Sequence, residues 1–158
     1  MSNIDRIDQK IIFFLQQDGR LTNFELADKV GLSPSPCLRR VKNLEQKGLI
    51  AGYTAIIDEV SYGYPLTAFV SVRLENQTDQ ILKSFEKEIT SLEAVMDCWL
   101  VTGNRDYLLR VVASDLKNYE IFMREELTKV KGIASIETNF ALGRVKTKNN
   151  LPLNSKFN

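Results

Sequence analysis

The hydrophobic periodicity of this chain changes once, at residues 58–65, and this change constrains the fold more than any other feature. Before it, apolar side chains recur every three or four residues, which is the spacing of amphipathic helices. After it, segments that alternate apolar and polar side chains, as half-buried strands do, are interleaved with helical segments. The connecting sequence DEVSYGYP combines acids, glycine and proline, which interrupt regular structure. We therefore expect two folding units joined by a hinge.

The first part predicts two short helices and a turn that leads into a third. Asp5 can cap the first helix, and Gly19 is expected to end it. Thr22 and Glu25 have the spacing of a capping box for the second helix, which Gly31 ends because glycine tolerates a positive φ. A short helix, a turn containing glycine and a second helix form a helix-turn-helix unit.

The third predicted helix begins at Ser33 or Ser35 and ends before Gly48. Its apolar stripe is expected to be Leu38, Val41 and Leu44, and Cys37 is expected to pack beneath the helix. The segment LIAGYTAII, residues 49–57, is rich in β-branched and aromatic residues and predicts a short ribbon or wing.

The second part predicts an α+β unit with the order β-α-β-β-α-β. Strands are expected at 66–74, 95–101, 107–113 and 133–142, with helices at 79–89 and from Asp115, the second with an apolar stripe that runs to Val130. This order is ferredoxin-like, as in ACT-like domains. Its helices cover one sheet face, so the other face needs a partner, and a second copy of the chain is the economical one. The residues expected on that face or beside it are Thr67, Phe69, Ser71, Cys98 and Leu100.

Composition excludes several classes of function. The chain of 158 residues has no histidine, which argues against Ser-His-Asp chemistry, His-ligated zinc and most acid–base enzymes. Its two cysteines cannot complete an all-cysteine zinc site, and free thiols fit a reducing cytoplasm. No apolar run approaches the ~20 residues that span a bilayer. We expect a cytoplasmic protein that is not an enzyme and has no metal, cofactor or membrane contact.

The charges are placed unevenly. The stretch from Ser33 to Tyr53 contains four basic residues and only one acidic residue, although the whole chain has a formal charge of only +1. One face of the third helix carries Ser35, Pro36, Arg39, Arg40, Asn43 and Gln46, types that contact bases and phosphates. A second interpretation stays open at this point, because a basic helix face can also be merely solvated.

A second candidate site is the loop Thr102–Asp106. An α-amino acid needs donors for its carboxylate and an acceptor for its ammonium group, and the loop offers the N–H of Gly103 and the carboxylate of Asp106. The alternative is that Gly103 and Asp106 only build a tight hairpin turn.

Three separated motifs resemble the Lrp/AsnC family of bacterial and archaeal transcription regulators. They are DGRLTNFELADKVGLSPSPCLRRVKNLEQKGLIAGYTAIID (18–58), VTGNRDYLL (101–109) and RVKTKNNLPL (144–153). The resemblance implies a winged helix-turn-helix domain at 1–60, a hinge at 61–65, a ferredoxin-like effector and oligomerisation domain at 66–143, and a basic tail at 144–158. It also implies homodimers that assemble further, to tetramers or octamers.

With this resemblance, the predicted site residues are as follows. Those expected to contact double-stranded DNA are Ser33, Ser35, Pro36, Arg39, Arg40, Lys42, Asn43 and Lys47. Ser35, Pro36, Arg39 and Asn43 are expected nearest the bases, with Arg40, Lys42 and Lys47 towards phosphates. Those expected to bind the effector are Thr102, Gly103, Asn104, Asp106 and Thr138. Ile136 stands where several relatives carry a hydroxyl.

The expected function is sequence-specific regulation of transcription, of amino-acid metabolism genes, modulated by a small effector such as an amino acid. The alternative is a small-molecule-binding module without sequence-specific DNA binding. Enzymes that resemble this family rely on histidines, which this chain lacks.

Overall fold

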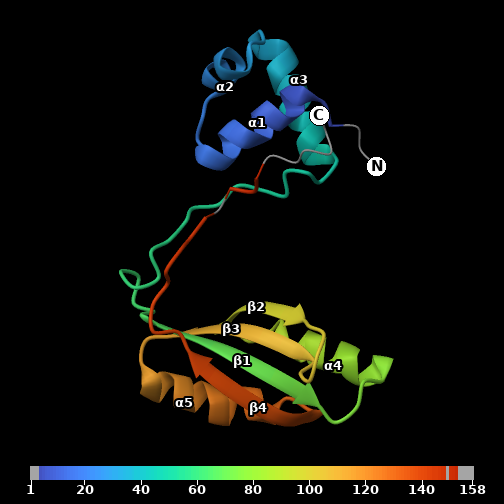
Figure 1. The fold of residues 1–158 in the computed structure, drawn as a ribbon, viewed down its shortest axis with the longest axis vertical. Coiled ribbons are helices and arrows are strands. Elements are labelled where there is room, and N and C mark those ends of the chain that lie inside the picture. Colours follow the sequence, from blue (N-terminus) through green and yellow to red (C-terminus); the bar gives the residue numbers. More distant parts are fainter. Residues whose placement is uncertain (1–3, 149, 153–158) are drawn as a thin grey trace. The chain divides into compact units, whose positions relative to one another are not determined.

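The computed structural model describes residues 4–148 and 150–152, and the chain divides into two compact units (Figure 1). The helical unit comprises the described residues up to Ala55 and from Val145 onward. The sheet unit is Ile56–Arg144. Within the described ranges, no helix is both long and apolar enough to cross a membrane.

The helical unit contains α1 (Arg6–Gln17), α2 (Asn23–Val30) and α3 (Pro34–Gln46). The predicted caps of α1 and α2 are confirmed. The Asp5 carboxylate accepts the N–H groups of Ile7 and Asp8, both at 2.9 Å, and Thr22 forms a capping box with Glu25. These bonds satisfy N–H groups that the first turn of a helix leaves without partners. Ser33 occupies the N-cap of α3, but its side chain makes no capping bond.

The turn between α2 and α3 depends on Gly31, as predicted. Gly31 has φ 75° and ψ 38°, the left-handed conformation that side chains disfavour. The helix α1 ends directly before Gly19, as predicted, with Asp18 as its C-cap, but Gly19 does not take the positive φ of a typical C-terminal glycine. The Asp18 carboxylate accepts the N–H of Arg20 at 2.8 Å, and this local bond turns the chain before glycine is needed.

The core of the helical unit differs from the predicted stripe at one position. Its buried members are Ile11, Leu26, Ala27, Val30, Cys37 and Leu44. Cys37 is fully buried, as expected, whereas Leu38 is 43% exposed and does not belong to the core. Successive helical residues are about 100° apart around the axis, so the burial of Cys37 turns Leu38 outward.

The predicted ribbon at 49–57 is not formed as a pair of strands. Residues 51–57 have no strand assignment, and no described segment pairs with them. A ribbon needs a hydrogen-bonded neighbour, and the described part of this single chain provides none. Tyr53 instead donates its hydroxyl to Glu45 at 3.0 Å.

The sheet unit has the predicted order of elements. These are β1 (Leu66–Leu74), α4 (Asp79–Ile89), β2 (Val95–Leu100), β3 (Tyr107–Ala113), α5 (Leu116–Glu125), the 3-10 turn η1 (Leu127–Lys129) and β4 (Ile133–Phe140). The antiparallel sheet has the strand order β2-β3-β1-β4. The ferredoxin-like prediction is confirmed. The second helix is shorter than its apolar stripe predicted. The last two apolar residues of that stripe are buried, but Leu127 lies in η1 and Val130 directly after it.

The two sheet faces differ as the alternation in β1 predicted. Ala68, Val70, Val72 and Leu74 are buried in a core that includes Phe85 and Ile89 of α4 and Tyr119 and Phe122 of α5. The opposite side, called the open face here, carries Phe69, Ser71, Trp99, Leu108 and Arg110, which the strand register places across from one another.

The assignment of Cys98 and Leu100 to the open face is wrong. They pair with Leu109 and Tyr107, two buried residues of the helix-covered face. Both are nevertheless exposed, because β2 is an edge strand of the sheet. Trp99, between them, points to the open face and is 46% exposed.

The burial pattern of α3 generates a matched pair of substitutions. Leu44→Ala removes a fully buried side chain and should lower the free energy of unfolding by about 2–5 kcal/mol. Leu38→Ala changes an exposed side chain of the same type and should cost less than about 0.5 kcal/mol. Urea denaturation followed by far-UV circular dichroism measures both. Equal losses would contradict the core assignment.

Candidate functional site

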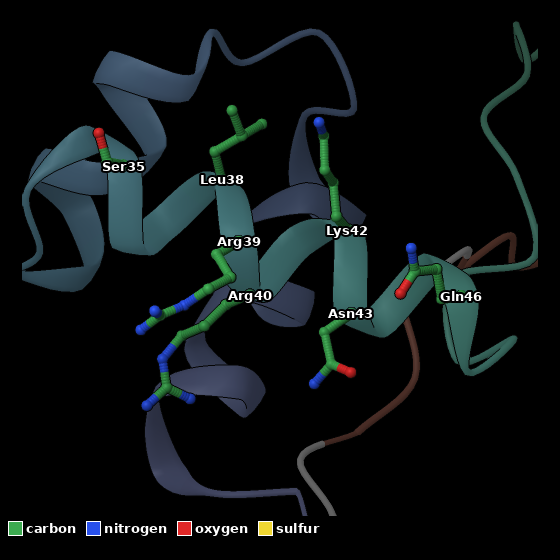
Figure 2. A pocket seen from close by; sticks show the side chains of 7 residues that line it. All are labelled: Ser35, Leu38, Arg39, Arg40, Lys42, Asn43 and Gln46. Carbon is green, nitrogen blue, oxygen red and sulfur yellow. The ribbon is translucent and has the colours of Figure 1, made fainter.

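The exposed side of α3 borders an open, concave region with a volume of about 710 Å³ (Figure 2). We call it the α3 surface. It is lined by Ser35, Leu38, Arg39, Arg40, Lys42, Asn43 and Gln46. Five of these residues are among those predicted to bind DNA, so the helix brings them together on one side. Ser33, Pro36 and Lys47, also predicted, are not among the lining residues.

The position of α3 is fixed by one hydrogen bond that the sequence pattern did not reveal and by core packing that it predicted. The Asn23 amide of α2 donates to the Pro34 carbonyl at the start of α3, at 2.8 Å. Cys37 and Leu44 pack into the core on the inner side of the helix. The two contacts hold the first turn and the body of α3 against α2, which leaves its polar residues facing solvent.

The guanidinium of Arg40 ties α3 to the start of α1. Its Nη1 lies 2.7 Å from Asp5 Oδ2 and 2.8 Å from Asp8 Oδ1. The hydrogen bonds that Arg40 donates to the carboxylates of Asp8 and Asp5 raise the pKa of Arg40 above its ordinary value. The backbone N–H of Asp8, and then the bond from Arg40, lower the pKa of Asp5. Both shifts favour the charged forms of Asp5 and Arg40.

The other cations predicted to contact DNA differ from Arg40. Arg39, Lys42 and Lys47 are exposed, and none of them forms an ion pair with a described residue. Exposed cations without partners are available to phosphate oxygens. With Ser35 and Asn43 between them, they place charge around side chains that can hydrogen-bond to base edges.

The loop between β2 and β3 is a closed turn with an exposed tip. Thr102, Gly103 and Asn104 are exposed, and Gly103 has φ 118°. The Val101 N–H donates to the Asp106 carbonyl at 2.9 Å and closes the turn. The conformation of Gly103 is one that a residue with a Cβ rarely adopts.

Asp106 differs from the loop tip because it is buried. Its carboxylate accepts the N–H of Leu74 at 2.7 Å and the side-chain amide of Gln77. Both partners lie at the end of β1 or just after it, so Asp106 joins the loop to the β1–α4 connection. The carboxylate thus has internal partners outside the hairpin, and the hairpin itself is closed by backbone atoms.

Thr138 lies farther from the loop than the other predicted effector residues. It pairs with Val70 in the sheet, whereas the loop begins and ends near the level of Val72. Its hydroxyl is 2.6 Å from the Tyr119 hydroxyl of α5, on the helix-covered face.

The residues that contact the loop from β4 are Ser135 and Glu137, which the sequence reasoning missed. Arg105 donates to Ser135 at 3.1 Å and forms an ion pair with Glu137 at 2.6 Å. Their alternation along the last strand was a signal for a shared face, but nothing in the sequence named their partner.

Family models match both units in chain order. Residues 4–51 match a model described as winged helix-turn-helix DNA-binding, and residues 67–151 match the Lrp/AsnC ligand binding domain. The protein belongs to the Lrp/AsnC family of transcription regulators. The family assignment made from the three motifs is confirmed, and so is the function class: a transcription regulator with a DNA-binding and a ligand-binding domain.

Full-length relatives support this assignment. The chain is 46% identical to the Bkd operon transcriptional regulator of Pseudomonas aeruginosa, covering 97% of this chain and 100% of that one. It is 43% identical to the leucine-responsive regulatory protein of Rhizobium meliloti, covering 90% and 92%. These Lrp/AsnC relatives are named as regulators rather than enzymes.

Solved structures of the family agree with the fold. A transcriptional regulator of Neisseria meningitidis in complex with L-Met has a TM-score of 0.89 and 36% identity, covering 95% of this chain and 97% of that one. An AsnC family regulator of Agrobacterium tumefaciens has the same TM-score and identity, covering 94% and 97%.

Proposed function

We propose that this Lrp/AsnC regulator binds operator DNA through the α3 surface. The observation that supports this most directly is that Arg39, Lys42 and Lys47 are exposed, near Ser35 and Asn43, and form no ion pair with any described residue. In this proposal α3 enters the major groove, with Ser35, Pro36, Arg39 and Asn43 nearest the bases. Lys42 and Lys47 contact phosphates, and Ser33 lies at the N-terminus of α3, where backbone N–H groups favour an anion.

The protein is proposed to act as a homodimer formed through the open face. Phe69 and Trp99 are 37% and 46% exposed there. Arg110 lies among them, paired with Asp97 and with Glu59 at 2.8 Å. A sheet face of apolar side chains with neutralised charges suits a second copy of itself, because a two-fold axis brings like surfaces together. Further assembly to tetramers or octamers is part of the same proposal.

A two-fold dimer sets the geometry of the operator. Its half-sites should form an inverted repeat, with centres ~34 Å apart or a multiple of that distance. One helical unit carries few cations that are not in ion pairs with described residues, so its own affinity for DNA is modest. When several helical units are tethered in one assembly, binding of one raises the effective concentration of the others at the DNA. The affinity of the assembly is therefore higher than that of one unit.

The effector is proposed to be an amino acid, as in the L-Met complex of the Neisseria relative. The exposed residues Thr102, Gly103 and Asn104 offer backbone and side-chain donors for a carboxylate. Asp106 and Thr138 already have internal partners, so we give them the role of fixing the walls of the site. The proposed site of action is the cytoplasm, where the DNA of a bacterial or archaeal cell lies, and the proposed targets are genes of amino-acid metabolism.

The alternative function is a ligand-binding module without sequence-specific DNA binding. It predicts that duplexes selected from a random pool share no sequence. The α3 surface favours the DNA-binding function, and selection followed by footprinting separates the two.

The role of Arg39 can be tested against that of Lys42. Arg39→Ala should lower discrimination between the selected operator and a scrambled duplex by about 1–3 kcal/mol, because a base contact is lost. Lys42→Ala should weaken binding to both duplexes alike and make the salt dependence shallower. Titrations at several salt concentrations measure both effects. Uniform weakening by Arg39→Ala would assign Arg39 to phosphates instead.

The open face can be tested by adding charge to it. Phe69→Arg should place two extra guanidinium groups near the two-fold axis, beside Arg110, and shift the protein towards monomers in sedimentation velocity. Leu116→Arg, at an exposed position on α5, is the matched control and should leave the dimer intact. A dimeric Phe69→Arg protein that keeps its fold would exclude this interface.

The effector loop can be tested by calorimetry with each of the twenty amino acids. At least one should bind, and Asn104→Ala should weaken that binding by about 10- to 100-fold, the value of a hydrogen bond to a charged group. Lys83→Ala, at an exposed position of α4, serves as the control. Unchanged affinity in Asn104→Ala would remove Asn104 from the site.

A further inference from the structure

Two adjacent arginines of α3 have different electrostatic surroundings. Arg39 is exposed and has no ion-pair partner among the described residues, whereas Arg40 contacts both Asp5 and Asp8. Both arginines nevertheless line the α3 surface (Figure 2). The difference between them that the structure shows is the pair of carboxylates beside Arg40, Asp5 at the cap of α1 and Asp8 in its first turn.

We propose that Asp5 and Asp8 withhold Arg40 from DNA phosphates, and that the three residues form a positioning cluster which sets the sequence discrimination of α3. This inference rests on the proposed DNA binding by the α3 surface. It assigns a function to two acids outside the helix-turn-helix, and it replaces the sequence-based expectation that Arg40 is a phosphate contact.

Because Asp8 is buried, its contact with Arg40 is costly to break. Its side chain is 9% exposed, and its Oδ1 is 2.8 Å from Arg40 Nη1. A carboxylate removed from water loses several kcal/mol of hydration unless a cation or hydrogen bonds compensate it. A phosphate that drew Arg40 away would leave the Asp8 carboxylate with the N–H of Asp5, at 3.4 Å, and without its cation. The second carboxylate, Asp5, is half-exposed and adds a contact of 2.7 Å.

The charge of the cluster points the same way. Two carboxylates and one guanidinium sum to a charge of −1, so the cluster as a whole does not attract phosphate. Non-specific binding depends on phosphate attraction, whereas recognition of a sequence also requires a fixed orientation of α3. Arg40 joins α3 to the start of α1 through these contacts. The cluster therefore limits non-specific binding and supports recognition of a sequence.

Asparagine substitutions test the cluster with little change of shape. Asn is as good an N-cap as Asp, so Asp5→Asn keeps the start of α1. In the full-length double variant Asp5→Asn/Asp8→Asn, Arg40 is released. Binding to a scrambled duplex should become tighter. The slope of log K against the logarithm of the salt concentration should steepen by about 0.9 for each helical unit bound to the DNA. Discrimination in favour of the operator should fall.

Arg40→Gln decides whether Arg40 causes these changes. In the wild-type background it should leave the salt slope unchanged, because Arg40 does not contact phosphate there. In the Asp5→Asn/Asp8→Asn background it should abolish the added slope. Lys42→Gln, the matched control, should make the slope shallower in both backgrounds. Circular dichroism checks folding, and Asp8→Asn alone, which neutralises the buried carboxylate and keeps the Asp5 cap, replaces a double variant that does not fold.

Two results would overturn the inference. One is an Arg40→Gln slope that falls in the wild-type background as much as that of Lys42→Gln. The other is no gain of non-specific affinity when the carboxylates are neutralised. Failure of the proposed function looks different, because a folded wild-type protein would then show no salt-dependent DNA binding and no response to Lys42→Gln.

Discussion

Each unit of this protein buries a carboxylate, and the hydrogen bonds which that carboxylate requires hold the functional segment in place. Asp8 and Asp106 are each 7% exposed and are the buried charged residues of the described chain. A buried carboxylate costs several kcal/mol unless it is paired. Asp8 obtains its partner from α3, and Asp106 obtains its partners from the end of β1 and the segment after it. The need for compensation thus links α1 to the proposed DNA-binding helix, and the proposed effector loop to the sheet.

Features encoded by neighbouring residues were predictable from the sequence. Capping by Asp5 and Thr22, the turn at Gly31 and the alternation in β1 each depend on residues within a few positions of one another, and each is confirmed. The order of elements follows from these local patterns, which is why the fold class could be predicted. The domain limits and the site residues stay predictions, because nothing in the sheet or helix patterns tests them.

Features that depend on distant partners could not be predicted. Arg40 and Asp8 are separated by 32 residues, as are Arg105 and Glu137. Nothing in the local pattern of either residue indicates its partner. The choice between Cys37 and Leu38 for the core has the same origin. Both are apolar and adjacent, so the neighbours in α1 and α2, rather than the periodicity of α3, decide which one is buried.

The sheet unit also connects the two chain segments that lead to the helical unit. Glu59, shortly after the unit begins, pairs with Arg110 of β3 at 2.8 Å and with Arg144, its last residue, at 3.0 Å. Arg110 in turn holds Asp97 of β2. One carboxylate therefore connects β3, and through Arg110 also β2, with both ends of the sheet unit. Because the side chains of Arg110 and Glu59 are only 19% and 27% exposed, solvent screens this pair less than it screens ion pairs on the surface.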